Sequence, residues 1–197
     1  MRELDEGEGY SVVKVVRECL EEGYGAEVGV TDKTLWCSLI PRKINIFMWR
    51  ARMARLPTQV AINDKGIDID TVLCLRCGEI AEDIDHALVS CKEVKNMWER
   101  VGRWWNKPLS GVNLVSQLTQ EDEELLEKSK GKSLWVGAKW ALCYLIWHNR
   151  NGWAFKGDKC RIREKYYEWQ LVVFEWLSRR SKSSGLSWNS WLAGICG

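Results

Sequence analysis

The sequence has no hydrophobic run long enough to span a lipid bilayer. Its longest apolar stretch, Trp140–Trp147, is far shorter than the roughly 20 residues that a transmembrane helix needs. The first ten residues, Met1–Tyr10, also lack the apolar core of a secretory signal and hold Arg2 against four acidic residues. We therefore expect an intracellular protein, nuclear or cytoplasmic and not secreted, whose cysteine thiols stay reduced.

The sequence also has little net charge. The total is only +2, so it gives no strong electrostatic signal by itself. The distribution is uneven: between Thr31 and Gly66 seven basic residues stand against two acidic ones, whereas acidic residues prevail between Ile67 and Arg100. The basic segment is therefore the candidate surface for an anionic partner.

Histidine is scarce as well, with two in the chain, and one of them falls among clustered cysteines. The pattern Cys74-x2-Cys77-x8-His86-x4-Cys91 supplies three thiolates and one imidazole, which match the closed tetrahedral shell of structural zinc. We expect one structural Zn²⁺ and no open coordination position for a substrate. Two alternatives are ordinary buried cysteines beside an unrelated histidine, and a thioredoxin-like redox pair at Cys74 and Cys77.

The remaining cysteines are scattered along the chain and show no comparable spacing. They are Cys19, Cys37, Cys143, Cys160 and Cys196. We interpret the first three of these as small buried hydrophobic residues.

Apolar residues at helical spacing predict that the fold is mainly α. One helix begins after Pro41, and its apolar stripe is Ile44, Phe47, Met48 and Ala51. Pro57 ends this helix, Thr58 can cap a second, short helix, and Lys65-Gly66 closes that helix with a glycine able to adopt positive φ. Further helices are predicted from Cys91 to about Trp105, over 134–150 and over 161–180, with short extended segments near 10–16 and 67–72. The predicted architecture is a small helical zinc-binding domain with short extended segments, followed by a second helical block.

Several stretches resemble the zinc-binding domain of plant non-long-terminal-repeat retrotransposon reverse transcriptases. They are Leu35–Arg50 with its Pro41-Arg42-Lys43 step and Phe47-Met48-Trp49-Arg50, Arg55-Leu56-Pro57-Thr58, and the Cys74, Cys77, Gly78, Glu82, His86, Cys91 and Trp98 series. The resemblance covers about Gly9 to Trp105, and Trp147–Phe155 is similar to a stretch found downstream in such elements. Leu88 and Val89 depart from the aromatic pair that often precedes the last cysteine.

This resemblance sets the predicted domain limits. We assign 9–105 to the reverse transcriptase zinc-binding domain, 106–133 to a Glu- and Lys-rich linker, 134–180 to a helical C-terminal segment and 181–197 to a flexible tail.

In that family the module lies C-terminal to the polymerase, which implies RNA or DNA as its partner. Polymerase chemistry needs carboxylates for two divalent ions, typically including an adjacent aspartate pair in this family, and the sequence has no Asp-Asp. We therefore expect no enzymatic activity and no catalytic residues in this chain.

The candidate nucleic-acid-binding residues are Arg42, Lys43, Arg50 and Arg52, which lie off the apolar stripe of the helix after Pro41. Basic residues beside aromatics, as in Trp147–Arg150, can neutralise phosphates and stack bases, although most of the 13 tryptophans are expected in the core. The competing interpretation of the basic helix is an ordinary solvated face. The alternative function is a zinc-stapled protein-interaction domain or an inactive retroelement remnant.

Overall fold

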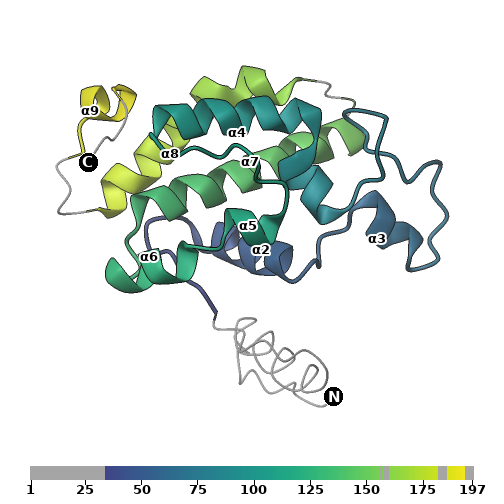
Figure 1. The fold of residues 1–197 in the computed structure, drawn as a ribbon, viewed down its shortest axis with the longest axis horizontal. Helices are drawn as coiled ribbons and strands as arrows, with labels where there is room; N and C mark the ends of the chain where they lie inside the picture. Colours follow the sequence, from purple (N-terminus) through teal and green to yellow (C-terminus); the bar gives the residue numbers. More distant parts are fainter. Residues whose placement is uncertain (1–33, 156, 158–159, 182–185, 194–197) are drawn as a thin grey trace, which may run out of the picture. The chain divides into compact units, whose positions relative to one another are not determined.

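The computed structural model describes residues 34–155, 157, 160–181 and 186–193, and over these residues the protein is helical. Its elements are α2 (Arg42–Arg52), α3 (Gln59–Asn63), the π-turn η1 (His86–Ser90), α4 (Lys92–Trp104), α5 (Val115–Leu118), α6 (Asp122–Lys128), α7 (Leu134–Phe155), the 3₁₀ turn η2 (Ile162–Lys165), α8 (Tyr166–Arg180) and α9 (Trp188–Leu192) (Figure 1). The described residues hold no β-strand, only an isolated antiparallel bridge between Leu73 and Ala81. The mainly α prediction is confirmed, whereas the extended segment predicted near 10–16 and the domain start at residue 9 lie outside the described residues.

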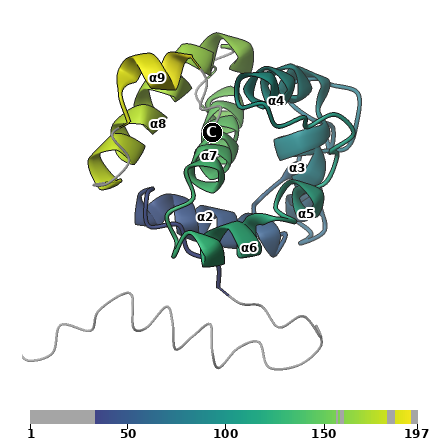
Figure 2. The ribbon, with the colours of Figure 1, turned by 60° about the vertical axis from the view of Figure 1, so that its left-hand side comes forward.

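Helix α7 is the central helix of the described unit (Figure 2). Most of its residues are buried, and α2, α6, α8 and η1 all pack against it. Gly137 allows this close packing, because a Cβ at that position would lie 3.1 Å from Leu177 Cδ2 and 3.3 Å from Ile40 Cγ2. Although α7 is long, no described helix combines the length and the apolar character needed to cross a membrane.

Helix α2 follows the sequence prediction closely. Pro41 stands at its N-cap, and Ile44, Phe47, Met48 and Ala51 are all buried. Its apolar face meets α7 through an edge-to-face contact between Phe47 and Tyr144, with ring centroids 5.5 Å apart. Because this face is held in the core, the remaining residues of α2 project from a fixed position.

The loop after α2 also carries the predicted turn signals. The Thr58 side chain caps α3 by accepting a hydrogen bond of 3.2 Å from the backbone N–H of Ala61. Gly66 has φ +73°, a left-handed conformation that favours glycine and ends this helical turn.

Residues 106–133, predicted as a linker, lie within the packed unit and contain α5 and α6. Val115, Leu118 and Leu126 are part of the hydrophobic core, and the described residues from Thr34 onward belong to one compact unit. The buried carboxylate of Asp122 accepts hydrogen bonds from Lys139 at 2.5 Å and from Trp140 at 2.7 Å. The structure therefore differs here from an exposed connection, because Asp122 binds the segment to α7 and the three apolar side chains lie in the core.

The C-terminal region also differs from the flexible tail expected after residue 180. Its described part contains α9, whose Trp191 is fully buried and donates a hydrogen bond of 3.1 Å to the Gln170 carbonyl. Trp191 lies edge-to-face against Trp104 and Trp105, with centroids 4.7 and 5.5 Å apart. Aromatic packing of this kind holds the described part of the tail against α4 and α8.

Candidate metal centre

The first two candidate ligands lie on a tight turn between α3 and η1. The backbone N–H of Gly78 donates to the Cys74 carbonyl at 2.7 Å, and the N–H of Cys74 donates to the Ile80 carbonyl at 2.8 Å. Gly78 has φ +69°, so the glycine that follows the Cys-x2-Cys pair adopts the left-handed conformation that the turn requires. This turn brings the side chains of Cys74 and Cys77 to the same side.

The other two candidate ligands lie at the two ends of the π-turn η1: His86 is its first residue, and Cys91 follows its last residue. In an α-helix, a residue five positions further on is rotated by about 140° around the axis, so His86 and Cys91 would point apart. Here the N–H of Cys91 donates to the His86 carbonyl at 3.1 Å, the i to i+5 bond of a π-turn, which widens the turn and realigns the two residues. The start of the turn is held by the Asp83 carboxylate, which accepts from the His86 backbone N–H at 2.7 Å.

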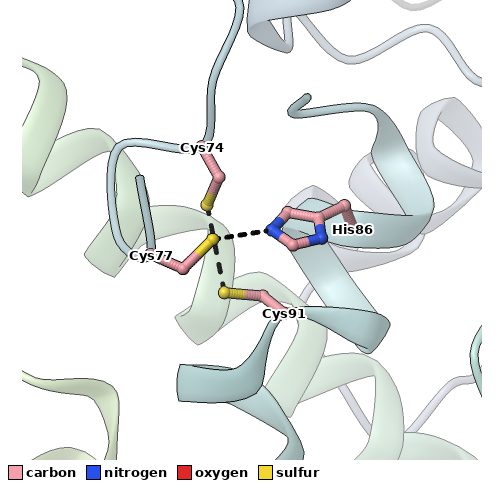
Figure 3. Close-up of side chains that lie close together, drawn as sticks. All are labelled: Cys74, Cys77, His86 and Cys91. Atoms are coloured by element: carbon pink, nitrogen blue, oxygen red, sulfur yellow. Dashed lines mark hydrogen bonds between the residues drawn. The ribbon is translucent and has the colours of Figure 1, made fainter. Parts of the chain in front are cut away.

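The four side chains predicted as ligands converge (Figure 3). Their ligand atoms all lie within 4.8 Å of one another, with Cys74 Sγ 3.9 Å from Cys91 Sγ and Cys77 Sγ 3.3 Å from His86 Nε2. Tetrahedral zinc with Zn–S of about 2.3 Å and Zn–N of about 2.0 Å requires S–S and S–N separations of roughly 3.8 and 3.5 Å. These two separations in the structure are close to the required values, so the donor set fits a tetrahedral metal ion.

The four candidate ligands are mostly shielded from solvent. Cys74, His86 and Cys91 are buried and Cys77 is half-buried, so Cys77 is the most exposed of the four. Among the described residues, no other group of three or more such side chains comes together. The thioredoxin-like alternative requires a βαβ setting, and the described residues around Cys74 contain no strand.

Arg76, between the two cysteines of the turn, is a buried cation that sequence reasoning missed. It is 8% exposed and donates from one terminal nitrogen to the Ala87 carbonyl, while among the described residues nothing accepts from its Nε or its other terminal nitrogen. The hydrogen bond with Cys91 lowers the pKa of the Cys74 thiol, and the positive charge of Arg76 acts in the same direction. A Zn²⁺ ion with three thiolates carries one net negative charge, which a buried guanidinium offsets.

Glu82 and Arg150 form a second feature that the sequence did not reveal as a pair. Both are fully buried, and Arg150 donates to Glu82 Oε1 from Nε at 2.9 Å and from a terminal nitrogen at 2.5 Å. The same carboxylate oxygen accepts from the backbone N–H of Gln59 at 3.3 Å. The metal loop is thereby connected to α3 and to α7, although Arg150 lies 68 residues further along the chain.

The structure separates the remaining cysteines from this cluster. Cys37 and Cys143 are buried, and burial raises the pKa of the Cys37 thiol to about 11 and the pKa of Cys143 further still. Cys160 is half-buried and is not part of the cluster. The interpretation as buried hydrophobic residues is confirmed for Cys37 and Cys143, whereas Cys19 and Cys196 lie outside the described residues.

The predicted nucleic-acid-binding residues all lie on α2 but differ in exposure. Arg42, Lys43 and Arg50 are exposed, whereas Arg52 is half-buried and its charge acts on Asp122. The Lys43 ammonium lies 5.4 Å from the centroid of the Tyr144 ring on α7. Three of the four residues are thus exposed on α2, whereas Arg52 is half-buried.

The fold and the donor set define a helical domain with a three-cysteine, one-histidine cluster of the metal-binding type. Residues 13–98 match the sequence pattern of the family described as zinc-binding in reverse transcriptase. The resemblance to a reverse transcriptase zinc-binding domain is therefore confirmed for this part of the chain, which contains all four cluster residues and Glu82 but not Arg150. No curated protein and no solved structure was found to match the chain.

Proposed function

We propose that this chain is a zinc-stabilised nucleic-acid-binding module derived from the reverse transcriptase of a plant non-long-terminal-repeat retrotransposon. In this proposal it has no polymerase catalysis of its own. The observation that carries the proposal is the convergence of Cys74, Cys77, His86 and Cys91 inside the segment that matches the family. The resemblance of Trp147–Phe155 to a downstream stretch of such elements supports the retrotransposon source.

Zinc is the metal that suits this donor set best. Three thiolates and one imidazole favour a soft or borderline ion, and a buried tetrahedral arrangement excludes the oxygen-rich octahedral shells of Mg²⁺ and Ca²⁺. Four protein ligands complete the tetrahedral shell of one Zn²⁺, so the ion supplies a cross-link and leaves no position for a catalytic water. When bound, zinc would join the Cys74–Cys77 turn to η1, which packs directly against α4 and α7.

The nucleic-acid part of the proposal depends on α2. Its buried stripe fixes the helix on α7, so Arg42, Lys43 and Arg50 present their charges from a rigid base. Lysine and arginine side chains bind phosphates and release counterions, which produces salt-dependent affinity. The acidic residues of the metal loop argue that this contact is made by α2 and not by the loop itself.

A paired charge reversal on α2 tests this proposal. The variant Lys43→Glu with Arg50→Glu should retain its metal but bind single-stranded RNA or DNA more weakly. The slope of log affinity against log salt should fall by about 0.7 for each lost phosphate contact. The matched control, Lys107→Glu with Arg163→Glu, changes two exposed basic residues outside α2 and should leave this slope nearly unchanged.

One observation favours the alternative of a protein-interaction domain. Helix α8 exposes Tyr167 and Leu171, which are 69% and 57% accessible and lie four residues apart on the same face. If the wild-type protein binds neither RNA nor DNA at low salt but retains zinc, the nucleic-acid proposal is refuted and the interaction domain or an inactive remnant replaces it.

A further inference from the structure

A groove runs between α2 and α7 on the surface that carries the exposed basic residues. Its volume is about 330 Å³, at the small end of the roughly 300–1,000 Å³ range of ligand clefts. Its lining residues are Lys43, Ile46, Phe47, Arg50, Leu56, Pro57, Tyr144, Trp147, His148 and Asn151. The groove thus combines two basic residues of α2, Lys43 and Arg50, with three residues of the Trp147–Phe155 stretch.

The α7 side of this groove is an aromatic wall. Tyr144 and His148 lie one helical turn apart, with ring centroids separated by 4.3 Å, and His148 is exposed. Phe47 packs edge-on against Tyr144 from the core side, which limits the movement of the tyrosine ring. Trp147 is only 7% exposed, so of the two rings from this stretch that line the groove, His148 is the exposed one.

The α2 side supplies two cations and an apolar side chain. Lys43 and Arg50 are seven residues apart, which places them on one face about 10 Å apart along the helix axis. Ile46 lies between them and is 53% exposed. None of the ten described lining residues is acidic, so the electrostatic character of the groove favours an anion.

We propose that this groove binds one segment of single-stranded nucleic acid. A base stacks on the wall formed by Tyr144 and His148 and contacts Ile46, while neighbouring phosphates bind Lys43 and Arg50. Exposed rings beside cations are the combination that single strands require, because every base offers a π-face and every linkage offers a negative charge. A duplex keeps its bases stacked inside and cannot insert one without unpairing. This inference rests on the proposed nucleic-acid function and adds to it the binding mode.

A base-dependent binding assay tests the groove separately from the phosphate contacts. The probes are a fluorescent ten-nucleotide oligouridylate, an abasic oligonucleotide of equal length and charge, and a duplex of equal length, all measured by anisotropy with the zinc-loaded full chain. The groove predicts that the oligouridylate binds roughly ten-fold or more tightly than the abasic strand, which corresponds to the stacking of one or two bases. Equal affinities for the two strands would overturn the groove while leaving phosphate binding by α2 intact. No binding of any probe would refute the proposed function itself.

Two groove variants sharpen this test. Ile46→Glu blocks the groove with a carboxylate, and its matched control Ile67→Glu changes a residue of nearly equal exposure, 53% against 55%, that does not line the groove. Ile46→Glu should remove the preference for the base-containing strand, and Ile67→Glu should retain it. His148→Ala should reduce the same preference while leaving the affinity for the abasic strand unchanged. If His148→Ala and Ile46→Glu both behave as wild type, the base does not lie in this groove.

Discussion

The buried pair of Glu82 and Arg150 allows a sharp prediction about how the metal loop is attached to the helices. The change Glu82→Gln keeps the size and shape of the side chain but leaves Arg150 as a buried, uncompensated charge. Both residues are fully buried and share two hydrogen bonds, at 2.5 and 2.9 Å. Removing one partner of such a pair costs about 3–5 kcal/mol, a large share of the roughly 5–15 kcal/mol that stabilises a typical domain.

The assay is urea unfolding of the zinc-loaded protein, followed by circular dichroism and by zinc release. The matched control is Glu124→Gln, which breaks the exposed pair with Lys128 and should leave the free energy of unfolding nearly unchanged, because solvent screens this pair. In a double-mutant cycle, Glu82→Gln with Arg150→Met should cost clearly less than the sum of the single changes, because neither charge is then left alone. A cost below about 1 kcal/mol for Glu82→Gln, or additive costs in the cycle, would refute the reasoning.

Three further predictions follow from buried groups. Arg76→Met should lower zinc affinity by about 10- to 100-fold in a chelator competition, because the buried cation offsets the negative charge of the three thiolates. Arg76→Lys should restore part of this affinity, and an unchanged affinity in Arg76→Met would contradict the role of Arg76. Burial raises the pKa of the Cys37 thiol from 9.0 to about 11, so this thiol loses its proton at lower pH in the unfolded chain than in the folded one. The stability that Cys37 contributes is therefore present below about pH 9 and is lost as the pH rises toward 11. The stability advantage of the wild type over Cys37→Ala should therefore shrink by about 2–3 kcal/mol over that window, and a constant difference would contradict the assigned burial effect. Trp191→Ala should destabilise the protein by about 3–5 kcal/mol, whereas a tail that does not pack would give no change in the urea midpoint.

Local patterns in the sequence were sufficient to predict much of the fold. The apolar stripe of α2 and the cap at Thr58 depend on neighbours a few residues away, and both are as predicted. The left-handed conformations at Gly66 and Gly78 follow from the same short-range rules. The metal cluster was predictable because the four ligands of a tetrahedral ion all lie within eighteen residues, at a spacing typical of zinc sites.

Features that depend on distant parts of the chain were not predictable in this way. The Glu- and Lys-rich composition of residues 106–133 indicates exposure, and only the tertiary structure shows that Leu118 and Leu126 are buried against the core. The pairing of Glu82 with Arg150 leaves no local signal, because each residue alone has the appearance of an ordinary surface charge. Likewise, the spacing of His86 and Cys91 does not by itself predict a π-turn at η1. The π-turn is explained only by the three-dimensional requirement that both side chains point toward the same cluster.

The most direct test of the central claim is the metal content of the full chain purified without chelator. Native mass spectrometry combined with elemental analysis should find one zinc per chain, and Cys77→Ala should lower this content because only three of the four ligands remain. Wild-type protein that contains no zinc and carries a disulfide between Cys74 and Cys77 would contradict the account and favour a redox pair in its place.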